Sequence, residues 1–467
     1  MTILLSVDGA SVSAANGEIV APVSFSLKAG RPFTILGETG SGKSLLAQAI
    51  IGLLPSGLTA TGSLTIDGET LPLAEPKLFR KLWGRTVGVL PQEPWLALDP
   101  TMVALDQVAE GHRYLGRLDE DEAVSAARTD LEALGVLDAE AKLPGQLSGG
   151  MAQRVAFAAA RAGGARIIIA DEPTKGLDVA RRDEVITLLM QEVQAGGTVL
   201  TITHDLALAR QMGGDLAVML EGQIIEAGEA ADVLASPSHD YTQRLIAAEP
   251  ENWAQRASAV RDDADPILIA SGLKKVRGGK LLFDGQDIAL RPGEIVGITG
   301  PSGSGKSSLG DVLLGLLKAD AGEVIRLPQA SAVRYQKLYQ DPPSAFPQKI
   351  TLGEAIADLL RLHRLDGTRV APLMERLRLS PVLLTRLPTE VSGGELQRFA
   401  LLRVLLLDPV FLFADEPTSR LDLITQQETI DLLTELARER NCAVLLVSHD
   451  AALIEKTCDR QLRIGRA

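Results

Sequence analysis

The chain repeats itself, and this repetition limits its fold more than any other feature. Four short strings recur in the same order in the two halves. They are GETGSGKS at 37–44 and GPSGSGKS at 300–307, LSGGMAQR at 147–154 and VSGGELQR at 391–398, ADEPT at 170–174 and 414–418, and a THD or SHD triplet at 203–205 and 448–450. Self-similarity of this kind predicts two equivalent domains on one polypeptide, which suits a length of 467 residues.

The segment between the two copies has the composition of a linker. Residues 251–265 are polar and show no strand-like alternation. We therefore expect a first domain at 1–250, a linker at 251–265 and a second domain at 266–467. The slightly longer polar stretch 249–265, some 17 residues, would reach at most about 60 Å when extended, enough to let the two domains face each other.

Composition narrows the class of protein. The chain is 46% hydrophobic and 23% charged, which is typical of soluble globular domains, and its net charge of -13 argues against broad attraction to nucleic acid. Its two cysteines give neither a disulfide framework nor a zinc or iron–sulfur cluster. The start lacks the pattern of a secretory leader, and no uncharged stretch reaches the roughly 20 residues of a membrane helix. We expect any action at a membrane to require docking on other subunits.

Short apolar runs predict a parallel α/β arrangement. The runs at 32–36 and 294–299 stop at the glycine-rich strings, and helical patterns follow. Further strand-like runs end at the acids of ADEPT and just before the histidines of the triplets. Open parallel sheets bind ligands at the carboxyl ends of their strands, so the polar groups are expected to gather there.

Each glycine-rich string fits the phosphate-binding pattern GxxxxGK[ST]. Glycines allow backbone N–H groups to converge on phosphate oxygens, the lysine holds the outer phosphates, and the serine binds Mg²⁺. A single string of this kind could be a chance glycine-rich turn, but two between a strand and a helix could hardly be. The predicted nucleotide-binding residues are Gly37, Glu38, Thr39, Gly40, Ser41, Gly42, Lys43 and Ser44 in the first copy and Gly300, Pro301, Ser302, Gly303, Ser304, Gly305, Lys306 and Ser307 in the second.

The acid pairs of ADEPT suggest a metal ligand followed by a catalytic base. Asp171 and Asp415 are placed to bind Mg²⁺, directly or through water. Glu172 and Glu416 could polarise an attacking water. On its own, such a pair could equally be a helix N-terminal acid pair. The phosphate string upstream favours the catalytic interpretation.

The strings SGGMAQR and SGGELQR resemble the signature of ABC ATPases, and with the other motifs the resemblance covers nearly the whole chain. It implies two tandem P-loop domains, each with a mostly parallel core sheet, an antiparallel β subdomain and a helical signature subdomain. It also implies that the signature of one domain closes over ATP held by the phosphate loop of the other. A glycine pair at a helix start offers N–H donors to the γ-phosphate.

The resemblance assigns two composite sites, formed when the two halves pair within one chain. One combines Lys43, Ser44, Gln92, Asp171, Glu172 and His204 with Ser392, Gly393 and Gly394. The other combines Lys306, Ser307, Gln340, Asp415, Glu416 and His449 with Ser148, Gly149 and Gly150. Gln92 and Gln340 match the family's Mg²⁺-sensing glutamine, and the histidines match its γ-phosphate switch. Outside this context, each would be an ordinary loop glutamine or a structural histidine.

Two departures from the family are visible. No aromatic residue precedes either phosphate loop at the place where one often stacks on adenine. In the segment KGLD, which matches the family's D-loop, Lys175 and Gly176 stand where a serine and a small residue are usual. Adenine stacking and communication between the sites are therefore expected to differ from the common pattern.

The string PSHDYTQRLIAAEP, at 237–250, resembles the tail of ATPase subunits from peptide, opine and nickel importers. An ordinary amphipathic helix after a turn is the alternative. The resemblance implies an ATP-hydrolysing subunit on the cytoplasmic face of the inner membrane, with ATP and Mg²⁺ as cofactors. Its expected partners are two membrane permease subunits and a solute-binding protein, and no nucleic acid. A soluble double-ABC protein acting on ribosomes or nucleic acid, and a fused sugar or vitamin importer ATPase, remain alternatives.

Overall fold

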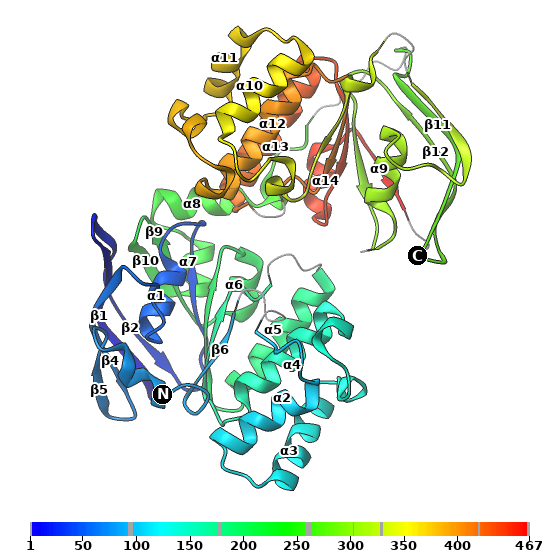
Figure 1. Cartoon of the computed structure of the whole chain (residues 1–467). Coiled ribbons are helices and arrows are strands. Elements are labelled where there is room, and N and C mark those ends of the chain that lie inside the picture. Colours follow the sequence, from blue (N-terminus) through cyan, green and yellow to red (C-terminus); the bar gives the residue numbers. More distant parts are fainter. Residues whose placement is uncertain are drawn as a thin grey trace. The chain divides into compact units, whose positions relative to one another are not determined.

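The computed structural model describes residues 2–91, 97–174, 179–256, 264–301, 303–326, 330–418 and 421–464. The chain forms two compact units, Met1–Ile246 and Ala247–Ala467. Figure 1 shows that each unit has strands at one end, helices at the other and a sheet between them. The tail string predicted to close the first domain spans the division between the units.

The residues that follow this division pack on the second unit. Trp253 is buried, and its indole N–H donates to the carbonyl of Ala248 at 3.0 Å. Arg256 bonds to Asp431 and Thr434 of the second unit. The first part of the expected linker is therefore ordered against the second unit, while 257–263 lie outside the described residues. The division into 1–250, 251–265 and 266–467 stays a prediction.

In the first unit, two sheets are built from ten strands among the described residues. The strands are β1 (Ile3–Ala14), β2 (Gly17–Lys28), β3 (Phe33–Leu36), β4 (Leu58–Ile66), β5 (Glu69–Pro72), β6 (Val87–Leu90), β7 (Ile167–Asp171), β8 (Thr198–Thr203), β9 (Asp215–Leu220) and β10 (Gln223–Glu229). The core sheet has the order β10-β9-β3-β8-β7-β6 and is parallel except for the hairpin strand β10. The antiparallel sheet has the order β2-β1-β4-β5.

The helices of the first unit fall into two groups. Helix α1 follows β3, while α2, α3 and α4 form a separate helical layer (Figure 1). Their apolar faces join α5 and strands β6 to β8 in one buried cluster. The helices are α1 (Lys43–Ile50), α2 (Ala104–Glu110), α3 (Glu120–Ala133), α4 (Gly149–Arg161), α5 (Val179–Gln194), α6 (Leu206–Met212), α7 (Ala230–Ala235) and α8 (Asp240–Ala247).

The second unit repeats this plan. Its described strands are β11 (Leu268–Arg277), β12 (Lys280–Leu290), β13 (Ile295–Thr299), β14 (Ala321–Arg326), β15 (Tyr335–Leu338), β16 (Phe411–Asp415), β17 (Ala443–Val447) and β18 (Arg460–Arg463). The core sheet, β15-β16-β17-β13-β18, is parallel, and β12-β11-β14 is antiparallel. The helices are α9 (Lys306–Leu314), α10 (Leu352–His363), α11 (Val370–Arg376), α12 (Gly393–Leu406), α13 (Leu423–Glu439) and α14 (Ala451–Thr457).

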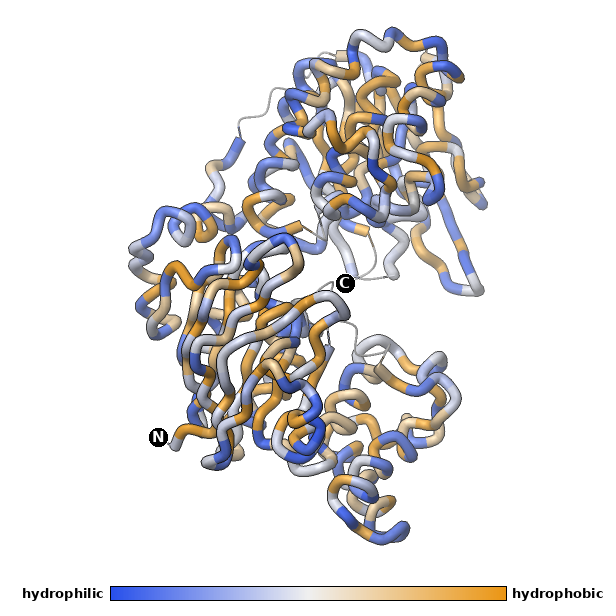
Figure 2. The backbone as a smooth tube through the Cα atoms, turned by 60° about the vertical axis from the view of Figure 1, so that its left-hand side comes forward, coloured by the Kyte–Doolittle hydropathy of each residue, from blue (hydrophilic) through white to orange (hydrophobic). Residues whose placement is uncertain are grey.

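The core strands are apolar because both of their faces are covered. Every residue of β3, β8, β16 and β17 is buried. Near-continuous apolar runs are what a parallel sheet covered on both faces requires. Apolar and polar stretches alternate along both units in Figure 2. The predicted fold class, two tandem α/β domains with mostly parallel core sheets, is confirmed.

Across the described residues, no helix combines the length and the apolar character that crossing a membrane would need.

Both cysteines lie in the second unit and are expected to resist modification in the folded protein. Burial raises the pKa of the Cys442 and Cys458 thiols to about 12. At pH 8 only about one in ten thousand of each of these thiols would then be in the reactive thiolate form. We expect an aromatic disulfide reagent to label the native chain at least about 100-fold more slowly than the chain in guanidinium. An added cysteine at exposed Thr39 is the fast-reacting control, and rapid native labelling of Cys442 or Cys458 would contradict the packing described here.

Candidate functional site

The first phosphate loop connects β3 to α1 and needs glycine at two positions. At Gly42, which precedes α1, φ is +98°, a region that residues with side chains rarely adopt. A Cβ there would also lie 2.9 Å from Val20 Cγ2, and one at Gly37 would lie 2.2 Å from the carbonyl oxygen of Met219. The glycines therefore allow the backbone to turn tightly against its neighbours.

The two loop lysines are held in matching positions. Lys43 is 5% exposed, and its Nζ donates to the carbonyl oxygens of Gly37 and Glu38, both at 2.7 Å. In the second loop, Lys306 Nζ donates to Gly300 O at 2.8 Å and to Pro301 O at 3.1 Å. Each ammonium is thus fixed beside the turn in which a phosphate chain would lie.

Each loop serine contacts the aspartate predicted to bind Mg²⁺. Ser44 Oγ donates to Asp171 Oδ1, and Ser307 Oγ donates to Asp415 Oδ1, both at 3.1 Å. Mg²⁺ prefers such oxygen donors and is usually held by one or two protein groups together with water and phosphate. The residues present therefore fit Mg²⁺ bound together with a nucleotide.

The glutamate after β7 is paired with the predicted switch histidine. Glu172 is 9% exposed, and its Oε1 lies 2.8 Å from His204 Nδ1. Thr203 Oγ1 donates to the other carboxylate oxygen at 3.4 Å. Glu172 has a φ of +48°, an uncommon conformation for a residue with a side chain. The strand end thus fixes the direction of this carboxylate, as a catalytic base would require.

The second copy has the same pairing with one difference. Glu416 also has a φ of +48°, but its Oε1 lies 2.7 Å from the other ring nitrogen, Nε2, of His449. Gln340 Nε2 donates to Glu416 Oε2 at 2.8 Å. The predicted glutamine, glutamate and histidine are therefore together in the second unit. Gln92, which in the first unit corresponds to Gln340, lies outside the described residues. Ser302 and the D-loop residue Asp178 also lie outside them.

The signature glycines begin α4 and α12, where Gly149 and Gly393 are exposed and Gly150 and Gly394 are partly buried. A Cβ at Gly394 would lie 3.3 Å from Thr425 Cγ2. Ser148 caps α4 by accepting from Met151 N at 3.3 Å, and Ser392 caps α12 by accepting from Glu395 N at 3.3 Å. A Cβ at Gly149, Gly150 or Gly393 would meet no described atom within 4 Å. Packing inside a unit therefore gives no reason for glycine at these positions. The close approach of something from outside the unit would give one.

Sequence reasoning missed a lysine in the second site. Lys337 Nζ lies 3.8 Å from Asp415 Oδ2 and 2.7 Å from Asp311 Oδ1. Burial raises the pKa of the Asp415 carboxyl, against the Ser307 hydrogen bond and the charge of Lys337, which lower it. In the first unit the position equivalent to Lys337 is Val89. Val89 of β6 pairs with Ile169 of β7, as Lys337 of β15 pairs with Phe413 of β16. The two predicted metal sites therefore differ in local charge.

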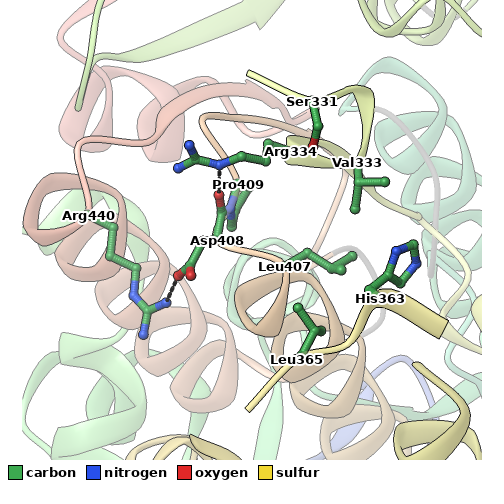
Figure 3. A pocket seen from close by; sticks show the side chains of 9 residues that line it. All are labelled: Ser331, Val333, Arg334, His363, Leu365, Leu407, Asp408, Pro409 and Arg440. Atoms are coloured by element: carbon green, nitrogen blue, oxygen red, sulfur yellow. Dashed lines mark hydrogen bonds and ion pairs between the residues drawn. The ribbon is translucent and has the colours of Figure 1, made fainter. Parts of the chain in front are cut away.

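A separate hollow in the second unit is not part of this site. Figure 3 shows Arg334 and Arg440 converging on Asp408, with His363 across the opening. Arg440 and Arg369 both bond to the Asp408 carboxylate, and Arg334 donates to the Asp408 backbone carbonyl. The hollow lies at the amino end of β16, whereas Asp415 and Glu416 stand at its carboxyl end. We therefore assign the arginines a structural role.

Known proteins resemble this chain across both units. The family model described as "ABC transporter" matches residues 20–175 and 283–419. The peptidoglycan transport ATP-binding protein YejF of Agrobacterium fabrum is 34% identical, over 97% of this chain and 89% of its own length. The glutathione import ATP-binding protein GsiA of Salmonella choleraesuis is 33% identical, over 95% of this chain and 81% of its own. Both relatives thus match across both units.

Solved structures support the fold over the same extent. The RNase-L inhibitor matches 97% of this chain with a TM-score of 0.64, and the archaeal ribosome recycling factor aABCE1 matches 98% with a TM-score of 0.65. Both are 21% identical and each is covered over 87% of its length, so they speak to fold alone. Two family matches, two equivalent phosphate loops and full-length relatives lead to one conclusion. The chain belongs to the ABC transporter family and carries two ABC ATPase domains in tandem.

Proposed function

We propose that this chain couples ATP hydrolysis to the import of a peptide-like solute. It would do so at the cytoplasmic face of the inner membrane, by driving two membrane permease subunits that receive the solute from a binding protein. The observation that carries the proposal is the doubled arrangement of loop lysine, serine–aspartate pair and glutamate–histidine pair. A single chain with both copies could supply both ATPase domains of a transporter.

The chemistry follows from the positions of the side chains. Lys43 and Lys306 would neutralise the outer phosphates, and the loop N–H groups would donate hydrogen bonds to phosphate oxygens. Mg²⁺, when bound with ATP at the serine–aspartate pairs, would neutralise the charge that develops between the β- and γ-phosphates. Glu172 and Glu416 would each orient a water and take its proton, and His204 and His449 would hold the carboxylates in position.

The open glycine turns favour closure of the two units over ATP. The turn at Ser392, Gly393 and Gly394 would cover nucleotide on the first loop. The turn at Ser148, Gly149 and Gly150 would cover nucleotide on the second. ATP would favour this closed arrangement only by binding it more tightly than the open one. Hydrolysis would then release the units, and the glutamine segments at Gln92 and Gln340 would transmit the change to the permease subunits.

Among the solutes named by the tail resemblance, peptides have the most support. The relatives are named for peptidoglycan and glutathione, and both of those compounds contain peptide bonds. Opines and nickel chelates have no counterpart in these names. In such importers the binding protein and the permease subunits select the solute, so the choice does not rest on residues of this chain.

The proposal is tested by reconstitution. The chain would be co-expressed with candidate permease subunits from the same organism, purified as a complex and placed in vesicles with their binding protein. ATP hydrolysis should rise several-fold when the binding protein carries a short peptide, and labelled peptide should enter the vesicles. A complex carrying Glu172→Gln and Glu416→Gln is the matched control and should show neither. A rate of ATP hydrolysis that does not change when peptide, permease or binding protein is added would contradict the proposal.

A soluble ribosome factor is the alternative function, and the match to aABCE1 shows a shared fold alone. The identity is 21% in that match, against 33–34% for the transport relatives. Sedimentation of a cell extract separates the two hypotheses. A ribosome factor would move with ribosomes when ATP hydrolysis is blocked, whereas an importer subunit would move with membranes.

A further inference from the structure

The tail of the first unit is fixed to the core sheet before helix α8 begins. Glu226 of β10 accepts hydrogen bonds through Oε1 from Ser238 N and Oγ, both at 2.7 Å, and through Oε2 from His239 N at 3.3 Å. Tyr241 N then donates to His239 Nδ1 at 3.1 Å. The first turn of α8 therefore has a defined position on the edge strand of the core sheet.

From that position the tail reaches the phosphate loop. Tyr241 is 6% exposed, and its hydroxyl accepts a hydrogen bond from the backbone N–H of Glu38 at 3.0 Å. Glu38 is the second residue of the loop, and its carbonyl oxygen accepts from Lys43 Nζ at 2.7 Å. Glu38 thus contacts the tail through its N–H and the nucleotide-binding lysine through its C=O.

The second phosphate loop cannot form this contact. In GPSGSGKS the position of Glu38 is taken by Pro301, which has no N–H to donate. The lysine contacts are otherwise the same, because Lys306 donates to Gly300 O and Pro301 O. The tail contact is therefore a difference between two loops of closely similar geometry.

We infer that Tyr241 is a positioning residue that holds the first phosphate loop ready for nucleotide and makes the two nucleotide sites unequal in affinity. The inference rests on the proposed assignment of that loop to ATP. A loop that is already ordered loses less conformational freedom when it binds a ligand, so its affinity is higher. Linkage requires the reverse effect as well, so nucleotide in the first site stabilises the docking of α8.

The test measures each site separately in the full-length chain. Lys306→Ala leaves nucleotide binding to the first loop, and Lys43→Ala leaves it to the second. In the Lys306→Ala background, Tyr241→Phe should weaken binding of a fluorescent ATP analogue by about 3- to 10-fold, the range expected for one hydrogen bond. In the Lys43→Ala background the same change should leave affinity unaltered.

Two further variants separate positioning from general stability. Tyr335→Phe removes a different tyrosine hydroxyl, which donates to the backbone carbonyl of Ile267 at 3.4 Å. This change should not alter affinity at the first site. Glu38→Pro gives the first loop the residue of the second, and in that background Tyr241→Phe should have no additional effect. Hydrogen exchange in α8 should slow on nucleotide binding in the parent and not in Tyr241→Phe.

Some results would overturn only the positioning role of Tyr241, and another would overturn the assignment of the first loop to nucleotide. Equal loss of affinity at both sites, no loss at the first site, or additive effects of Glu38→Pro and Tyr241→Phe would overturn the positioning role while leaving the nucleotide site intact. Absence of nucleotide binding in Lys306→Ala with Tyr241 unchanged would instead overturn the assignment of the first loop, and the tail inference with it.

Discussion

The double variant Glu172→Gln, Glu416→Gln is expected to hydrolyse ATP at least about 100-fold more slowly than the parent chain while still binding it. The amide has the shape of the carboxylate but cannot take a proton from water. It can still bond to the neighbouring histidine, which lies 2.8 Å away in the first unit and 2.7 Å away in the second. The loop lysines and serines are untouched, so affinity should change little. Phosphate release and equilibrium nucleotide binding measure the two effects.

The control is the same chemical change on the surface. Glu69→Gln alters an exposed carboxylate that pairs with Lys81 on the antiparallel sheet, and it should leave turnover within about twofold of the parent. Unchanged turnover in the double variant would refute the assignment of Glu172 and Glu416 as catalytic bases. Loss of nucleotide binding would show that these carboxylates hold the site together instead.

The parts of the site that sequence predicted are those fixed by backbone geometry. Gly42, with a φ of +98°, precedes a lysine that begins a helix, and Gly305 and Lys306 repeat the pattern, so the two copies together identify phosphate loops. Asp171 was placed near Ser44 because both follow the carboxyl ends of strands in one parallel sheet. The 3.1 Å contact between them agrees with that reasoning.

The parts that sequence did not predict depend on tertiary packing. Glu38 and Tyr241 are far apart in the chain, and only the position of α8 on the core sheet brings the hydroxyl to the loop. Lys337 faces Asp415 because β15 pairs with β16 in a particular register, which apolar periodicity does not specify. The choice of ring nitrogen, Nδ1 in His204 and Nε2 in His449, likewise follows from local side-chain orientation.

The pairing of each loop with the other unit's signature is expected to be visible as a nucleotide-dependent cross-link. Thr39→Cys marks the first loop and Val391→Cys marks the residue before the second signature. In the Glu172→Gln, Glu416→Gln chain, a short bis-maleimide should join these cysteines when ATP and Mg²⁺ are present and not in their absence. Mass spectrometry of the linked peptides identifies the product. The native thiols should not compete, since burial raises their pKa to about 12.

A matched pair tests whether the loop is covered from within its own unit. Leu147→Cys occupies, in the first unit, the position that Val391 occupies in the second. Thr39→Cys with Leu147→Cys should therefore stay unlinked under the same conditions. The open space around Gly149 and Gly393 leaves room for a partner surface, and the cross-link identifies that surface. Linkage of the same-unit pair, or a product joining two chains, would show that the two halves do not close over nucleotide within one polypeptide.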